Sequence, residues 1–429
     1  MVWFLSFIIF FLCLLITSSV DIKKNLIAKV VLIIFAIFQV FSFSIRPIYL
    51  VMFNPTNKEF LADRRLYPEY AESLPRAMIL EIFYLTLIFA CLRFLLRDKS
   101  IKSIVLDTEK FKTQLQKDNL IYFLLSFQVI AILAYLLGAI YVWRATNIFG
   151  SLGLALFFLY AEFRSVLQKF VAVSLFTIQS LVGLFIFESK FVLSLPGLFL
   201  IIRFLNSTKT KLQKNFTISL LAIFSAVIFP VLQNLTGKGL STLRLNLTPV
   251  VDSLISILER FDGLVSVIDA MALNGSQWMS TYSYMKLAFN QFIIKGIIFE
   301  TEYGVGQLWN MELRNVNQVS RKSITSVAFG VPAEGFAMWQ YWGIFFSSIC
   351  WSVVVFLIFL SKLSHTFLGH VFAISISCGN NAIFENGILS LLGAVNKGFQ
   401  CIFLIWLYYM FTARKLPKSI AVTKIYHHD

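Results

Sequence analysis

Long apolar runs separated by short basic segments make up most of the chain. A helix needs about 20 mainly apolar residues to cross the hydrocarbon core of a bilayer, so runs of this length predict about eleven membrane-spanning helices. They cover residues 2–19, 27–45, 77–96, 120–142, 146–161, 170–187, 191–205, 216–234, 335–360, 367–392 and 398–413. The pattern therefore predicts an all-α polytopic integral membrane protein.

One stretch, from about Gly237 to Gly343, interrupts the pattern with mixed polar, charged and apolar residues. The sequence thus divides into N-terminal transmembrane helices (1–236), a large external loop (237–334), C-terminal transmembrane helices (335–413) and a basic tail (414–429). Binding and catalytic residues are concentrated on loops held by a rigid scaffold. We therefore expect the chemistry in this loop; the alternative is a loop that only caps the bundle.

Composition and charge place the chain in a membrane. It is 58% hydrophobic and 14% charged, whereas soluble domains average about 25% charged residues. The net charge of +15 comes mostly from Lys and Arg between apolar runs, where they set orientation and meet anionic lipids. We expect membrane lipids and no nucleic acid as partners. The inside connections hold 19 Lys and Arg against 8 in the short outside ones, which predicts an N-terminus outside and a C-terminus inside.

Histidine and cysteine are absent from the large loop. The four histidines lie elsewhere, and the five cysteines fall in or beside apolar runs without metal-ligand spacing. Zinc sites use histidine or cysteine ligands, and a Ser-His-Asp site needs histidine. The sequence therefore predicts no metal and no cofactor.

Within the loop, residues 250–271 have apolar side chains at helical spacing. Such a helix is expected to lie flat on the outer membrane surface with its apolar face down. Its polar residues would then face water or another part of the loop. They are Glu259, Arg260, Asp262, Ser266 and Asp269.

Arginine, amide and aromatic residues follow later in the loop. Arg314, Arg321 and Lys322 suit the phosphate oxygens of a lipid-linked diphosphate, because Arg recognises phosphate with a planar, always-charged group. Amides and Trp309 suit a sugar, and the alternative is an ordinary hydrated loop. Glu334 opens the next span. It either complements the helix dipole or presents an acid at the water–membrane boundary.

Other polar positions accompany the spans. Lys190 and Glu188 lie between two apolar runs, as a pair or facing substrate. Residues 98–119 suit an interfacial cytoplasmic helix. The predicted span 367–392 contains Glu385 and three asparagines, so it must face protein or a cavity, or break into a re-entrant pair.

Three segments resemble bacterial oligosaccharide repeat-unit polymerases, the O-antigen polymerases of the Wzy type. SVAFGVPAEGFAMWQYWGIFFSS (326–348) is similar to the family's turn that leads through a Glu into a late span, with Ala333 where Gly is commoner. FESKFVLSLPGLFLII (187–202) resembles the mid-chain span that opens with a basic residue, here Lys190. LERFDGLVSVIDAM (258–271) resembles the Arg-containing helix of the external loop.

The resemblance implies a membrane glycosyltransferase of C-type fold, without metal or nucleotide, in the bacterial inner membrane. It would transfer a glycan from one undecaprenyl diphosphate carrier to another, making O-antigen or capsule. A chain-length regulator and a flippase are implied partners. Arg260 with Arg244, Arg314 or Arg321 would bind diphosphate, and Glu334 or Asp262 would act as the base or orient it.

Three other readings remain open. A flippase for lipid-linked oligosaccharide would want short loops, charges within the spans and two similar halves; Glu385 keeps this reading open. An O-antigen ligase would share the layout, but ligases resemble one another in a loop His that this chain lacks. A membrane acyltransferase would need His365 or His370, which the predicted topology puts near the inner side.

Overall fold

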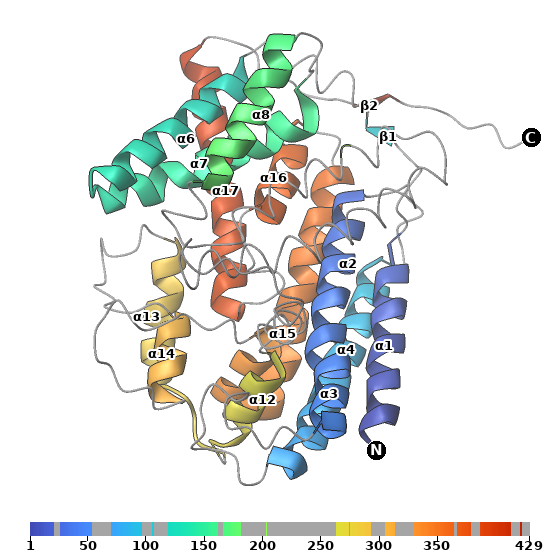
Figure 1. Cartoon of the computed structure of the whole chain (residues 1–429). Helices are drawn as coiled ribbons and strands as arrows, with labels where there is room; N and C mark the ends of the chain where they lie inside the picture. The colour runs from blue at the N-terminus through green and yellow to red at the C-terminus, as the bar shows by residue number, and fades with distance from the viewer. Residues whose placement is uncertain are drawn as a thin grey trace, which may run out of the picture. The chain divides into compact units, whose positions relative to one another are not determined.

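The computed structural model describes residues 1–20, 26–53, 70–96, 105–106, 119–161, 166–181, 203, 263–273, 275–292, 305–313, 330–363, 367–378, 387–412 and 421–422. These residues form two compact units. The larger unit combines Met1–Asp107 with Leu258–Asp429, and the smaller one is Thr108–Ile257. Helices dominate both units (Figure 1).

The larger unit contains the N-terminal helices and the chain from Leu258 onward, which includes most of the predicted loop. Its elements are α1 (Val2–Ser18), α2 (Leu26–Val40), the π-helix η1 (Phe41–Ile45), α3 (Arg46–Phe53), α4 (Tyr70–Leu96), β1 (Val105–Leu106), α12 (Gly263–Met271), α13 (Thr281–Phe292), α14 (Val305–Glu312), α15 (Val331–Leu363), α16 (Phe367–Cys378), α17 (Ile388–Phe411) and β2 (Ala421–Val422).

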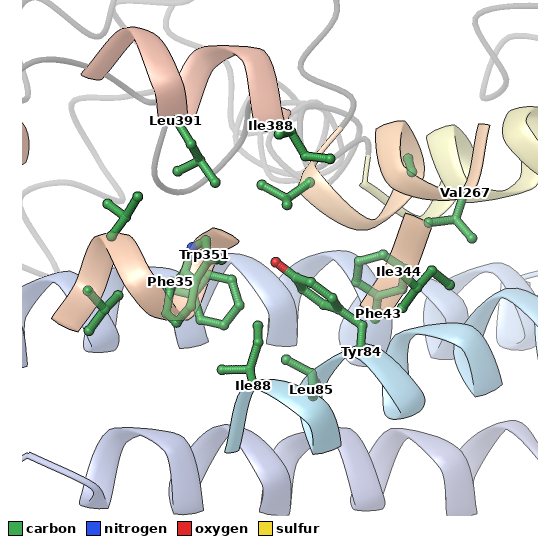
Figure 2. Close-up of a cluster of buried hydrophobic side chains, with 14 of the residues drawn as sticks. Phe35, Phe43, Tyr84, Leu85, Ile88, Val267, Ile344, Trp351, Ile388 and Leu391 are labelled. Carbon is green, nitrogen blue, oxygen red and sulfur yellow. The ribbon is translucent and has the colours of Figure 1, made fainter. Parts of the chain in front are cut away.

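The core of this unit lies where α4 packs against α1 and α15. Their apolar sequences supply large side chains that are fully buried. Figure 2 shows Phe35 of α2 against Trp351 of α15, with Tyr84 of α4 beside them. The Phe35 and Trp351 ring centroids are 4.0 Å apart. Such close packing fixes α15 against the N-terminal helices, and α15 in turn positions the site described below.

Helices α2, η1 and α3 run on without a break, so the second predicted span extends further than its apolar run. A serine pair joins this region to α1. The Ser6 hydroxyl donates to the Ser44 carbonyl oxygen at 3.3 Å, and the Ser44 hydroxyl donates to the Ser6 carbonyl oxygen at 3.0 Å. Hydrogen bonds of this kind hold apolar helices together in a bilayer, where the hydrophobic effect does not.

The smaller unit is built on a helical hairpin. Helices α6 (Leu120–Leu136) and α7 (Ile140–Tyr160) turn at Gly138, whose φ is +73°, and α8 (Val166–Leu181) follows. Gly153 lies so close to the α6 backbone that an added Cβ would be 2.7 Å from the Leu124 carbonyl carbon. Small residues allow this close approach of helices. Because the chain turns at Gly138, α6 ends at Leu136, and the predicted span 120–142 is shorter than its apolar run suggested.

Five helical stretches among the described residues are long and apolar enough to cross a membrane. They are Val31–Met52, Ser73–Leu96, Tyr141–Tyr160, Val331–Leu360 and Ile388–Phe411. Three shorter apolar helices are Val2–Ser18, Leu120–Leu136 and Phe367–Ser377. The chain is thus an α-helical membrane protein. The predicted spans 191–205 and 216–234 lie outside the described residues, apart from Arg203.

Two predicted elements differ from the structure. The run 367–392 is not one helix, because α16 ends at Cys378 and α17 begins at Ile388, so of the two expected alternatives a break fits and a single span does not. The last span is correspondingly longer than 398–413, which shows that apolar length alone misplaced this boundary. In the stretch 98–119, expected to be helical, the described residues Val105 and Leu106 form a short strand that pairs antiparallel with Val422 and Ala421, and most of the rest of that expectation falls on residues outside the described part.

This strand pair joins the 98–119 connection to the C-terminal tail. Two segments that pair must lie on the same side of a membrane. The charge count places both of them inside. The pairing is therefore consistent with the predicted orientation.

Helix α12 does not lie flat on a surface. All of its residues from Gly263 to Ala270 are buried, and it packs against α15, α4 and η1. The expectation that Ser266 and Asp269 face water is wrong, since they are 0% and 1% exposed. The alternative, that they face another part of the loop, holds for Asp269, which accepts a hydrogen bond from Trp309 of α14 at 3.3 Å.

Candidate functional site

Helix α15 is two helices joined by a sharp break. Trp339 (φ −140°, ψ 20°) and Gln340 (φ 54°, ψ −132°) leave the helical region. An added Cβ on Gly343 would overlap the carbonyl oxygen of Gly335. In a straight helix these two glycines would be about 12 Å apart along the axis. The first part of α15 therefore folds back on the start of the long part, and the two backbones touch where neither residue has a side chain.

Glu334 lies on this folded-back part and is fully buried. Its Oε1 accepts a hydrogen bond of 2.7 Å from the Tyr284 hydroxyl of α13. The backbone amides of Ile388 and Leu389 also act on the carboxylate, although Oε2 has no well-aligned hydrogen-bond partner among the described residues. These amides belong to the first turn of α17, where the helix dipole favours negative charge.

The surroundings of Tyr284 keep its hydroxyl protonated, so that it acts as a hydrogen-bond donor. Its side chain is 3% exposed. Burial, followed by the neighbouring Glu334 carboxylate, raises the pKa of the Tyr284 hydroxyl well above its ordinary value. The hydroxyl therefore keeps its proton at physiological pH and donates to Glu334 throughout. Ser280 precedes α13 and caps its N-terminus, because its hydroxyl accepts a hydrogen bond from the Ser283 amide at 3.2 Å.

Tryptophans fasten the rest of the loop to the same part of α15. The Trp278 amide donates to the Ala337 carbonyl oxygen at 2.9 Å. The Trp278 and Trp309 rings meet edge to face with centroids 4.8 Å apart, and Trp309 is bonded to buried Asp269. Helices α12 and α14 are thereby tied to the folded-back helix. The loop and the membrane helices form one packed structure at this point.

A cavity of about 510 Å³ lies at the break in α15; we call it the helix-break cavity. It is lined by Gly275, Gln277, Met338, Trp339, Gln340, Trp342 and Phe346. Its volume is within the range of about 300–1,000 Å³ typical of small-ligand sites. Aromatic rings and two side-chain amides provide most of its surface chemistry, and no charged residue is among those lining residues.

Glu334 and the helix-break cavity are connected through aromatic rings. The Tyr284 ring meets the Trp339 ring edge to face at 5.2 Å, and Trp339 meets Phe346 at 5.8 Å. Tyr284 thus contacts the buried acid with its hydroxyl and a cavity wall with its ring. Glu334 itself does not line the cavity. Its position suits holding Trp339 in place better than contacting a ligand directly.

Of the residues predicted to form the site, only Glu334 belongs to the described part of the chain. Arg260, Asp262, Lys190, Arg244, Arg314, Arg321 and Lys322 lie outside it. Their roles stay predictions. Among the described residues, no three of His, Cys, Asp or Glu form a group that could hold a metal ion.

Sequence reasoning missed Tyr284, Gln340 and the tryptophans of the cavity. One available signal was the pair Gly335 and Gly343, the second of which follows Trp339, Gln340 and Trp342. Small residues in an aromatic run permit close backbone contact. Tyr284 had no such signal, because its partner is 50 residues away.

The fold and the site together define an α-helical membrane protein with an aromatic- and amide-lined cavity at a broken membrane helix. No protein-family model, no curated protein and no solved structure matches the chain.

Proposed function

We propose that the protein is a membrane glycosyltransferase that polymerises oligosaccharide repeat units carried on undecaprenyl diphosphate. The helix-break cavity is the observation that carries the proposal. Aromatic rings with a few amides suit a sugar, because the electron-rich ring face attracts the C–H groups of a pyranose while the amides bind hydroxyls. The partners would be the lipid-linked oligosaccharide, a flippase that supplies it and a chain-length regulator.

The expected depth of the cavity in the membrane supports a lipid-linked substrate. Trp342 lines it and is 79% exposed, close to the beginning of the long part of α15. Exposed tryptophans at the ends of spans favour the membrane–water interface. A sugar attached to a membrane lipid presents its head group at this depth.

The reaction would exchange one glycosidic bond for another. A hydroxyl oxygen of the acceptor sugar bonds to the anomeric carbon of the donor, and the bond from that carbon to the diphosphate oxygen breaks. Undecaprenyl diphosphate leaves with the bonding electrons, and the hydroxyl proton passes to a base. Arg260, with Arg244, Arg314, Arg321 and Lys322, would stabilise the leaving diphosphate, and Lys190 would bind substrate.

Glu334 and Asp262 divide the remaining roles. Since Glu334 is buried and engaged by Tyr284, we assign it to positioning Trp339. Asp262 is then the proposed base for the acceptor hydroxyl. The protein would work in the bacterial inner membrane, with its large loop on the outer face and a C-type glycosyltransferase fold.

The experiment is complementation of a strain from which the gene has been deleted, with surface polysaccharide separated by length. Wild type should restore long polymer, whereas Arg260→Ala, Asp262→Asn and Trp339→Ala should leave single repeat units at normal protein level. Tyr282→Phe is the control, because Tyr282 is 78% exposed on the same helix as Tyr284. Normal long polymer from both Arg260→Ala and Glu334→Ala would contradict the assignment.

A transporter of lipid-linked oligosaccharide is the second candidate, favoured by Glu81. This residue of α4 is fully buried within a candidate span, and neither carboxyl oxygen has a hydrogen-bond partner among the described residues. Acids inside membrane helices commonly mark ion or substrate pathways. In reconstituted vesicles, loss of lipid-linked glycan translocation in Glu81→Gln, with no polymer formed by wild type, would favour the transporter.

A further inference from the structure

We propose that the helix-break cavity binds an N-acetylhexosamine ring, with Trp342 as the stacking surface and Gln340 as the residue that recognises the acetamido group. The proposal rests on the proposed function in taking a lipid-linked glycan as the substrate. It deepens that function by naming the sugar class.

Charge excludes an acidic sugar from this cavity. A uronic acid bound here would have its carboxylate among aromatic rings and neutral amides, with no cation from the lining residues. Burying a carboxylate without a partner is costly. Glu334, which contacts the cavity wall through Tyr284, would repel such a sugar. The ligand that fits is therefore uncharged.

Gln340 is held in a fixed orientation. Its Nε2 donates to the carbonyl oxygen of Gly275 at 2.9 Å. One N–H bond of the amide is committed to the loop, which leaves the second N–H and the carbonyl oxygen Oε1 available for a ligand. The carbonyl oxygen Oε1 can accept a hydrogen bond from the N–H of an acetamido group, or the free N–H can donate to its C=O, and a plain hexose has neither of these amide groups.

The backbone of Gln340 supports a ligand role. Its backbone angles, φ 54° and ψ −132°, are a combination that residues other than glycine rarely adopt. Residues held in such strained conformations cluster at active sites and ligand-binding segments. A glycine would fit this backbone without strain. The side-chain amide is what glutamine provides in exchange.

Gly275 allows the loop to approach. Its φ is +91°, and an added Cβ would lie 3.1 Å from Gln340 Nε2. The absence of a side chain here lets the loop backbone meet the amide directly. The loop thus sets the orientation of Gln340 in the cavity wall. Trp342, from the long part of α15, lines the same cavity.

The test is saturation-transfer NMR on the full chain in lipid nanodiscs. The probes are methyl N-acetyl-β-glucosaminide, methyl β-glucoside and methyl β-glucuronide. We expect saturation of the N-acetyl methyl group and the ring protons of the first probe, a signal at least fivefold weaker from the second and none from the third. Equal signals from the first two would overturn the role of Gln340, and binding of the glucuronide would overturn the sugar class.

Variants locate the binding in the cavity. Gln340→Gly should keep the fold, because it relieves the backbone, yet reduce selectivity for the N-acetyl probe to that for the glucoside. Trp342→Ala should abolish both signals. Trp406→Ala is the matched control, since Trp406 is an exposed tryptophan of α17 that does not line the cavity. Loss of binding in Trp406→Ala equal to that in Trp342→Ala would contradict the location.

The remaining outcomes separate this inference from the proposed function. No sugar signal, with saturation passing from lipid acyl chains to Trp342, would assign the cavity to lipid and overturn the inference. Selective N-acetyl binding in a protein whose cavity variants still give normal polymer would uphold the inference and contradict the polymerase. No binding of the N-acetyl probe, together with short polymer in Arg260→Ala, would overturn the inference and uphold the polymerase.

Discussion

At the scale of single residues, a buried side-chain hydrogen bond joins α13 of the large loop to α15. Tyr284 on α13 donates to Glu334 on α15, and both side chains are nearly or fully buried. The acid needs this donor, because a buried carboxylate oxygen without one is left desolvated. The same tyrosine holds Trp339 through its ring. A small change in Tyr284 should therefore affect both the stability of the protein and the shape of the cavity.

Tyr284→Phe should lower the free energy of unfolding by about 1–3 kcal/mol, because it removes the donor and leaves the buried acid behind. The measurement is denaturant unfolding in mild detergent. Tyr282→Phe, on the exposed side of the same helix, should change nothing. Equal stability of Tyr284→Phe and wild type would show that the bond contributes little to the fold.

At the scale of elements, the two parts of α15 meet at Gly335 and Gly343. A methyl group added at Gly343 would overlap the Gly335 carbonyl, which belongs to the backbone and cannot rotate away. At Gly263 an added Cβ would lie 3.1 Å from the Phe43 ring, which is a side chain and not backbone. An added methyl group would therefore meet backbone at Gly343 and a side chain at Gly263.

Gly343→Ala should destabilise the protein by about 3 kcal/mol or more, above the usual cost of overpacking, since the backbone must move. Gly263→Ala should cost less than half of that. The measurement is the melting temperature in detergent together with the monodisperse yield. Similar losses for the two variants would contradict the close contact within α15.

The elements also show what the sequence could predict. Apolar runs located α1, α4 and α7, because lipid-facing helices must be apolar along their length. They did not locate the break at Gln340, which depends on a contact between residues eight positions apart. They also suggested a surface helix where α12 is buried, because an amphipathic pattern looks the same whether its polar side meets water or, as for Asp269, a partner in another helix.

The candidate site was predictable to a smaller extent. Glu334 was recognised because an acid at the start of an apolar span is unusual. Its partner Tyr284 and the cavity residue Gly275 come from distant segments that only the fold brings together. Residue type suggested sugar chemistry in the loop, but the position of the cavity depended on the folded-back helix.

At the scale of the whole molecule, the pairing of β1 with β2 constrains the topology. Val105 is paired with Val422, so the connection after α4 and the C-terminal tail must share one side of the membrane. The excess of Lys and Arg in both segments predicts that this side is the inside.

A cysteine pair should report this arrangement. Val105→Cys with Val422→Cys, in a chain whose five native cysteines are replaced by serine or alanine, should form a disulfide on mild oxidation of membranes. Val105→Cys with Thr281→Cys, at the start of α13 in the loop predicted to lie outside, should not. Cross-linking of the second pair but not the first would contradict the predicted topology.

The central claim is that the helix-break cavity serves a glycan-polymerising enzyme. The most direct measurement uses the purified protein in vesicles, given lipid-linked repeat units isolated from cells that lack the gene. The products are separated by length. We expect wild type to produce a ladder of polymers with release of undecaprenyl diphosphate, and a folded Trp339→Ala variant to leave single units. Single units unchanged by wild type, or an equal ladder from Trp339→Ala, would contradict the account.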